Sequence, residues 1–147
     1  MRYLILFVAL CLVVPVDAGD GKIQRIEVTG NVALPPESKA PAKFRVVVEI
    51  MKVKPGKPIT LLQPVGRAQI ETAQSFPVSY TVACPRSALK DTPPELFILR
   101  ASVYEYPAKG GLRLVYKTPD NDRTEALSAN GEGRKDVRLT VAPVSGK

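Results

Sequence analysis

Residues 76–85 read "FPVSYTVACP", and apolar and polar side chains alternate along this stretch with a period of two. Such alternation is typical of a β-strand that has one face on a core and the other in solvent. Phe76, Val78, Tyr80 and Val82 share the apolar face, and Cys84 is the next position on it. Because a free cysteine behaves as a small hydrophobic side chain, we predict that Cys84 is a core residue rather than a reactive or cross-linking thiol.

The same alternation recurs along the chain, and fourteen scattered prolines leave little room for long helices. Clusters rich in proline, glycine and lysine separate the apolar runs, and strands with one apolar face need a second sheet to cover it. We therefore predict an all-β, single-domain sandwich of about seven antiparallel strands, immunoglobulin-like or transthyretin-like, over residues 19–147. The expected strands lie at 23–32, 44–53, 68–70, 76–84, 97–103, 112–116 and 137–141.

Three local features refine this prediction. The strand at 44–53 is apolar on both faces, which predicts a central position, whereas the strand at 23–32 carries charges and Gly30, which predicts a sheet edge open to strand addition by a partner. Gly110 and Gly111 predict a tight hairpin because glycine adopts positive φ without steric cost. Residues 87–90 are expected to form a single helical turn.

The N-terminal residues resemble a secretory signal. Arg2 precedes an apolar run that is too short to span a bilayer, and Val16-Asp17-Ala18 offers small residues at the two positions that a signal peptidase reads before it cuts after Ala18. We expect residues 1–18 to be removed and the rest to be exported to the periplasm or secreted, with no transmembrane span. Cys11 follows a leucine, which disfavours lipid attachment, so we expect Cys84 to be alone in the mature chain.

The composition argues against common catalytic chemistry. The chain has no histidine, so no imidazole is present to activate a nucleophile or bind a metal. Four glutamates, Glu49, Glu71, Glu95 and Glu105, fall on polar faces or edges of the expected strands, where solvent exposure is the ordinary outcome. We predict a non-enzymatic protein without a cofactor.

The acidic stretch near residue 120 has two interpretations, a calcium site and a flexible loop. Asp120, Asp122 and Thr124 have the opening spacing of a calcium-binding hand. Such a hand needs glycine at the sixth position, but this chain has Glu125 there. It needs an acidic residue at the twelfth position, but this chain has Gly131 there. This pattern favours a flexible loop that is acidic and then basic, and we predict no metal site.

The net charge of +7 predicts weak attraction to anionic surfaces. Lys52, Lys54 and Lys57 alternate on one side of a strand end and are the candidate anion-binding or partner-binding residues; a second basic cluster comprises Arg134, Lys135 and Arg138. The alternative is that edge lysines only prevent unwanted strand pairing. Aromatic residues mostly share the core face, so we expect no specific nucleic-acid binding.

Five short sequence segments occur in a fixed order over most of residues 23–144: "VTGNVALPP", "FRVVVEI", "FPVSYTV", "LFILRASVY" and "DVRLTVAPV". In these segments and their order the chain resembles the YbaY-type envelope lipoproteins, which include the YscW-type pilotins of type III secretion. The resemblance implies a small periplasmic β-sandwich without enzymatic activity. The chain departs from the family pattern in lacking a convincing lipid-attachment motif and in carrying an insertion over Pro119–Lys135.

These observations lead to two functional hypotheses. The first is an exported β-sandwich that binds an envelope protein or polymer. The second, which the resemblance implies, is a pilotin-like chaperone lipoprotein that assists secretin localisation in type III secretion, and it requires a lipid on Cys11.

Overall fold

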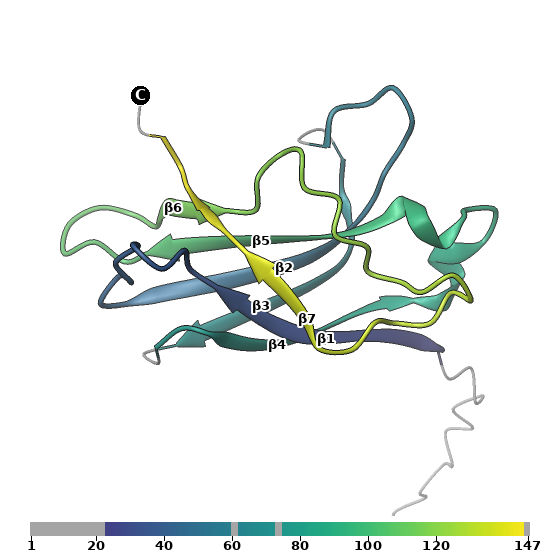
Figure 1. The fold of residues 1–147 in the computed structure, drawn as a ribbon, viewed down its shortest axis with the longest axis horizontal. Helices are drawn as coiled ribbons and strands as arrows, with labels where there is room; N and C mark the ends of the chain where they lie inside the picture. Colours follow the sequence, from purple (N-terminus) through teal and green to yellow (C-terminus); the bar gives the residue numbers. More distant parts are fainter. Residues whose placement is uncertain (1–22, 60–61, 73–74, 146–147) are drawn as a thin grey trace, which may run out of the picture.

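A computed structural model describes residues 23–59, 62–72 and 75–145. Two β-sheets pack face to face around one core, which confirms the predicted sandwich (Figure 1). The smaller sheet has the order β4-β1-β7, and the larger has the order β3-β2-β5-β6-β8. The strands are β1 (Arg25–Ala33), β2 (Phe44–Lys52), β3 (Pro64–Thr72), β4 (Val78–Pro85), β5 (Phe97–Glu105), β6 (Arg113–Lys117), β7 (Val137–Thr140) and β8 (Ala142–Pro143).

The core is built by the alternation that the sequence predicts. In β4 the side chains of Val78, Tyr80, Val82 and Cys84 are buried, and the intervening residues are exposed or half-buried. The prediction that Cys84 is a core residue is confirmed, because only 1% of its surface is exposed. Phe76 precedes the strand and stacks on Phe44 of β2, with 4.7 Å between ring centroids.

The predicted central position of β2 is confirmed, since β2 lies between β3 and β5. The predicted edge position of β1 is wrong, because β1 pairs with β4 on one side and with β7 on the other. The β1–β7 pairing is parallel, whereas the other strand pairs are antiparallel. Gly30 has a different role from the one predicted: a Cβ atom there would lie 1.9 Å from the carbonyl oxygen of Val137, so glycine permits β7 to approach.

Two predicted turns are found in modified form. Arg86–Leu89 forms a short 3₁₀ helix (η2), as expected, and a second one (η3) spans Pro94–Leu96. The hairpin between β5 and β6 exists, but its loop covers residues 106–112 and is therefore not tight. Gly110 has a φ of 97°, whereas Gly111 is not among the residues with positive φ.

The long segment from Pro119 to Lys135 is integrated into the fold rather than added to its surface. Ala126 and Leu127 are at most 1% exposed and belong to the core. The N–H of Ala126 donates to the carbonyl oxygen of Phe97 in β5 at 2.8 Å, and Thr29 of β1 donates to the carbonyl oxygen of Arg134 at 3.2 Å. The segment therefore bridges both sheets.

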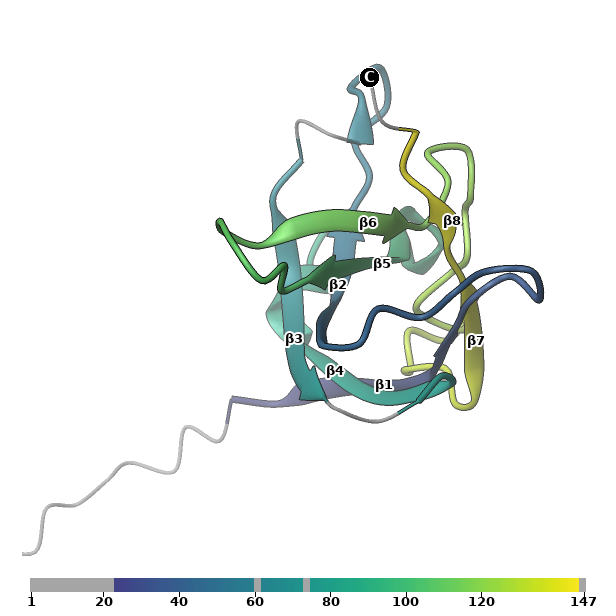
Figure 2. The same cartoon turned by 90° about the vertical axis from the view of Figure 1, so that its left-hand side faces the viewer.

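The chain passes from one sheet to the other near its C-terminus. β7 pairs with β1 in the smaller sheet, and β8, two residues further on, pairs with β6 in the larger sheet (Figure 2). Between them Val141 is buried, and its N–H donates to the carbonyl oxygen of Ala33 at 3.2 Å. This crossing connects the two layers along one side of the sandwich.

Candidate binding site at the end of β2

The candidate lysines lie where β2 leaves its sheet. Lys52 is the last residue of the strand, and the N–H of Val53 then donates to the carbonyl oxygen of Leu96 at 2.7 Å. A turn follows, in which the N–H of Lys57 donates to the carbonyl oxygen of Lys54 at 3.1 Å. The loop stands away from the sandwich, with Lys54 and Lys57 exposed and Lys52 half-buried (Figure 1).

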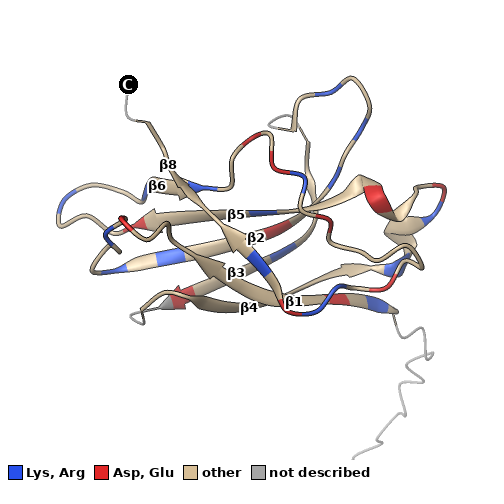
Figure 3. Ribbon diagram, viewed as in Figure 1, with Lys and Arg blue, Asp and Glu red and all other residues tan. Residues whose placement is uncertain are grey.

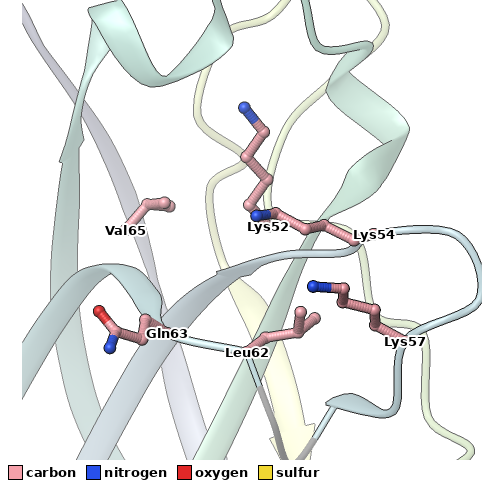
Figure 4. A pocket seen from close by; sticks show the side chains of 6 residues that line it. All are labelled: Lys52, Lys54, Lys57, Leu62, Gln63 and Val65. Carbon is pink, nitrogen blue, oxygen red and sulfur yellow. The ribbon is translucent and has the colours of Figure 1, made fainter.

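The three lysines line one cavity of about 330 Å³, which we call the basic pocket. Its other lining residues are Leu62, Gln63 and Val65, from the end of the same loop and the start of β3. Lys54 and Lys57 extend in the same direction, and the ammonium end of Lys57 points toward Leu62 (Figure 4). The structure thus brings together the three residues that the sequence singled out, and adds an apolar wall that the sequence analysis did not predict.

The basic pocket has an excess of positive charge. The sequence from 50 to 70 contains three lysines and Arg67 but no acidic residue, and the ribbon of this loop shows only basic positions (Figure 3). Among the described residues, none forms an ion pair with any of the three lysines. The described part of the chain therefore supplies no carboxylate within ion-pair distance of these three ammonium groups.

The outer face of the larger sheet differs sharply from the basic pocket, because its charges are paired. Glu49 and Arg67 approach to 3.6 Å across β2 and β3. Arg45 pairs with Glu71, which also accepts a hydrogen bond from the hydroxyl of Tyr106 at 2.6 Å. That hydrogen bond and the Arg45 charge hold the pKa of Glu71 below its usual value. Cations and anions alternate on this face and stabilise one another locally.

The four glutamates considered for acid–base chemistry are not arranged as a catalytic pair. Glu49 and Glu71 pair with arginines as described, and Glu105 pairs with Arg113. Glu95 lies in η3 and is exposed. These carboxylates act as partners for surface cations. The absence of enzymatic activity stays a prediction.

The acidic stretch near residue 120 uses its oxygen atoms within the protein. Asp120 accepts hydrogen bonds from Arg100 at 2.9 Å and from Lys117 at 3.1 Å, and these cations lower its pKa, Lys117 most. Asp122 accepts from both the N–H and the hydroxyl of Thr124, at 2.8 and 2.7 Å. Within the described ranges, no group of three or more acidic or cysteine side chains is placed to hold a metal ion.

The second basic cluster is dispersed. Arg134 pairs with Glu125 and donates to the carbonyl oxygen of Leu127 at 3.1 Å, whereas Lys135 is exposed. Arg138 lines a separate groove of about 540 Å³. The sequence carries no signal for this groove because its walls come from three distant segments; they include Asn31, Leu34, Pro35, Pro36, Phe76 and Pro77.

No model of a known protein family matches the chain, and no curated protein matches it. Among solved structures, the fold is similar to that described as "Structure of an alternative pilotin from the type II secretion system of Vibrio cholerae". The two share 14% sequence identity with a TM-score of 0.57, and the match covers 84% of this chain and 100% of the pilotin.

The similarity shows a fold shared with a pilotin. At 14% identity, the structural similarity does not show membership of the YbaY-type or YscW-type family that the sequence segments suggest. In the described part of the chain, no helix is long and apolar enough to cross a membrane.

Proposed function

We propose that this protein is a non-enzymatic, pilotin-like chaperone that binds an envelope protein of a secretion system. The observation that carries the proposal is the fold, because the match extends over the whole of a pilotin chain. The resemblance of the five sequence segments also favours a pilotin-like chaperone. Among the concavities on the described surface, the basic pocket and the groove beside Arg138 can each hold a partner segment.

The proposal departs from a lipid-anchored pilotin in one respect. The sequence favours cleavage after Ala18 over lipid attachment at Cys11. We therefore propose a chaperone that escorts its partner as a soluble periplasmic protein. Such a protein gains access to the outer membrane through the partner and not through an acyl chain.

The test is cross-linking in the native envelope followed by identification of the linked protein by mass spectrometry. We expect an outer-membrane subunit of a secretion system as the main product. Deleting the gene should then shift that subunit from the outer-membrane fraction to the inner-membrane fraction. Cross-links confined to unrelated proteins or to cell-wall polymer, or an unchanged distribution of the subunit in the deletion strain, would contradict the proposal.

A further inference from the structure

The basic pocket combines unbalanced cations with an apolar wall. On the outer face of the larger sheet, Arg45, Arg67 and Arg100 each have a carboxylate partner. At the pocket, the described residues supply no carboxylate to Lys52, Lys54 or Lys57. Three like charges around one cavity repel one another, so an anion that enters it relieves this repulsion and gains three attractive interactions.

The type of cation limits the type of anion. Lysine is a compact point charge with freely rotating donors, whereas arginine forms a rigid fork that matches one carboxylate or phosphate. Three lysines therefore suit several negative groups spread along a flexible ligand better than one fixed oxyanion. Lys54 and Lys57 are on a loop that lines the cavity, and their side chains extend in the same direction (Figure 4).

The size and the wall of the pocket also favour a ligand larger than an inorganic ion. A volume of about 330 Å³ lies in the range of cavities that hold organic ligands. Leu62 and Val65 line it and offer apolar contact that a free phosphate cannot use. The concave shape disfavours the flat surface of a bilayer. A peptide that carries carboxylates beside an apolar side chain satisfies both parts of the lining.

We propose that the basic pocket binds an acidic peptide segment, with its carboxylates at Lys52, Lys54 and Lys57 and an apolar side chain against Leu62 and Val65. The proposal rests on the proposed function, because it assigns this segment to the escorted envelope protein. Exposed charges give rapid and reversible association, which suits an escort that must release its partner.

The test uses fluorescence anisotropy of a labelled peptide in which aspartates alternate with leucines. The wild-type protein should bind this peptide more tightly than a matched peptide with asparagine at each aspartate. The triple variant Lys52→Gln, Lys54→Gln and Lys57→Gln should bind the acidic peptide about tenfold more weakly or worse, as expected for losing three solvent-exposed ion pairs. Sodium chloride should weaken the wild-type complex.

The matched control carries the same loss of charge elsewhere. Lys90, Lys109 and Lys135 are exposed and form no ion pair with a described residue. Changing these three to glutamine should alter peptide affinity by less than about twofold, since they lie outside the pocket. Equal weakening by both triple variants would reduce the effect to net charge and overturn the proposal. Thermal unfolding of both variants checks folding, and the double variant Lys54→Gln and Lys57→Gln repeats the measurement with the half-buried Lys52 intact.

Two competitors separate the alternative anions. Inorganic phosphate at the same ionic strength as sodium chloride should displace the peptide no better than the salt does. Vesicles that contain phosphatidylglycerol should not bind the wild-type protein more tightly than the pocket triple variant. Specific displacement by phosphate, or vesicle binding that depends on the three lysines, would overturn the peptide assignment.

The peptide measurement is independent of the escort function. If cross-linking identifies a secretion-system subunit with the wild-type protein and equally with the pocket triple variant, the escort stands and the pocket assignment fails. If the peptide binds as expected but no such subunit is cross-linked, the pocket binds acidic peptides and the escort proposal fails.

Discussion

Cys84 shows how the alternation of side chains along a strand decides whether a side chain is buried. Its thiol is 1% exposed, and burial raises its pKa, so both access and ionisation oppose reaction. We predict that the native protein resists thiol alkylation and is labelled only in denaturant. Rapid labelling of the native protein, or a disulfide-linked dimer as the main species, would show that this prediction is wrong.

A substitution at the same position tests the environment of the thiol. Cys84→Ser places a hydroxyl in an apolar site and should lower the free energy of unfolding by about 1–3 kcal/mol. Cys84→Ala is the matched control, because it removes the sulfur without adding a polar group, and should cost less than serine. Urea denaturation of the three proteins gives the comparison.

Tyr80 predicts a stability change at high pH. Its side chain is 4% exposed, its hydroxyl donates to the carbonyl oxygen of Val137 at 3.1 Å, and burial raises its pKa from 10.0 to about 12. A raised pKa stabilises the folded state below the unfolded value of 10.0, and this contribution is lost as pH rises from 10 to 12.

The control for this effect is Tyr80→Phe. At pH 9 this variant should be less stable than wild type by about 1 kcal/mol, because it lacks the hydrogen bond. Between pH 9 and pH 12 the wild type should lose about 2 kcal/mol relative to the variant. Urea denaturation at the two pH values measures both free energies, and parallel pH curves for the two proteins would contradict the prediction.

At the scale of elements, Gly30 determines how β7 joins the smaller sheet. A Cβ at this position would lie 1.9 Å from the carbonyl oxygen of Val137 and 2.7 Å from the hydroxyl of Tyr80. We predict that Gly30→Ala separates β7 from β1 and lowers the free energy of unfolding by about 1–3 kcal/mol or more. Gly111→Ala is the matched control, because its Cβ would meet no atom within 4 Å. Similar stability of the two variants would exclude this role for Gly30.

Most strands could be predicted from the sequence because each apolar face is encoded locally by a period of two. The position of a strand within its sheet is encoded less directly. β2 could be placed centrally because Val47 and Met51 make its second face apolar, and both are buried. The sequence misplaces β1 because its charges, Arg25 and Glu27, together with Gly30 are typical of an edge strand. A glycine also occurs in a central strand where the backbone of a neighbouring strand approaches closely. Both cases look the same in the sequence, and only the pairing with β7 shows that β1 is a central strand.

The flexible loop that the sequence predicts within segment 119–135 is wrong for a related reason. Its composition is polar, but Ala126 and Leu127 are buried through contacts with distant strands. Arg100 of β5 holds the start of the segment by donating to the carbonyl oxygens of Thr118 and Pro119, at 2.9 and 2.6 Å. Two adjacent buried residues are too few to produce a periodic pattern, so the packing of this segment could not be predicted.

At the scale of the molecule, the three lysines could be predicted as a group because they are close in sequence. The apolar wall of the basic pocket could not, since it depends on how the loop returns to β3. The groove beside Arg138 combines residues from 31 to 138 and has no sequence signal of its own.

Export is a prediction about the whole molecule, and the intact mass of the protein from a bacterial envelope tests it. The signal residues 1–18 lie outside the described residues, so their removal stays a prediction. We expect a mature chain that begins at Gly19, because Ala18 completes the peptidase site. A diacylated chain that begins at Cys11 would instead support a lipid-anchored pilotin. An uncleaved chain would contradict both routes.

The pairing of β1 with β7 has a consequence for the order in which the molecule is made. The first strand of the domain has its second neighbour more than 100 residues later, and the crossing to β8 comes last of all. During synthesis on the ribosome, the N-terminal half therefore emerges long before the strand that completes its sheet. Contacts of such high sequence separation form slowly. The smaller sheet therefore stays incomplete until β7 has been synthesised, and the crossing to the larger sheet forms only once β8 follows.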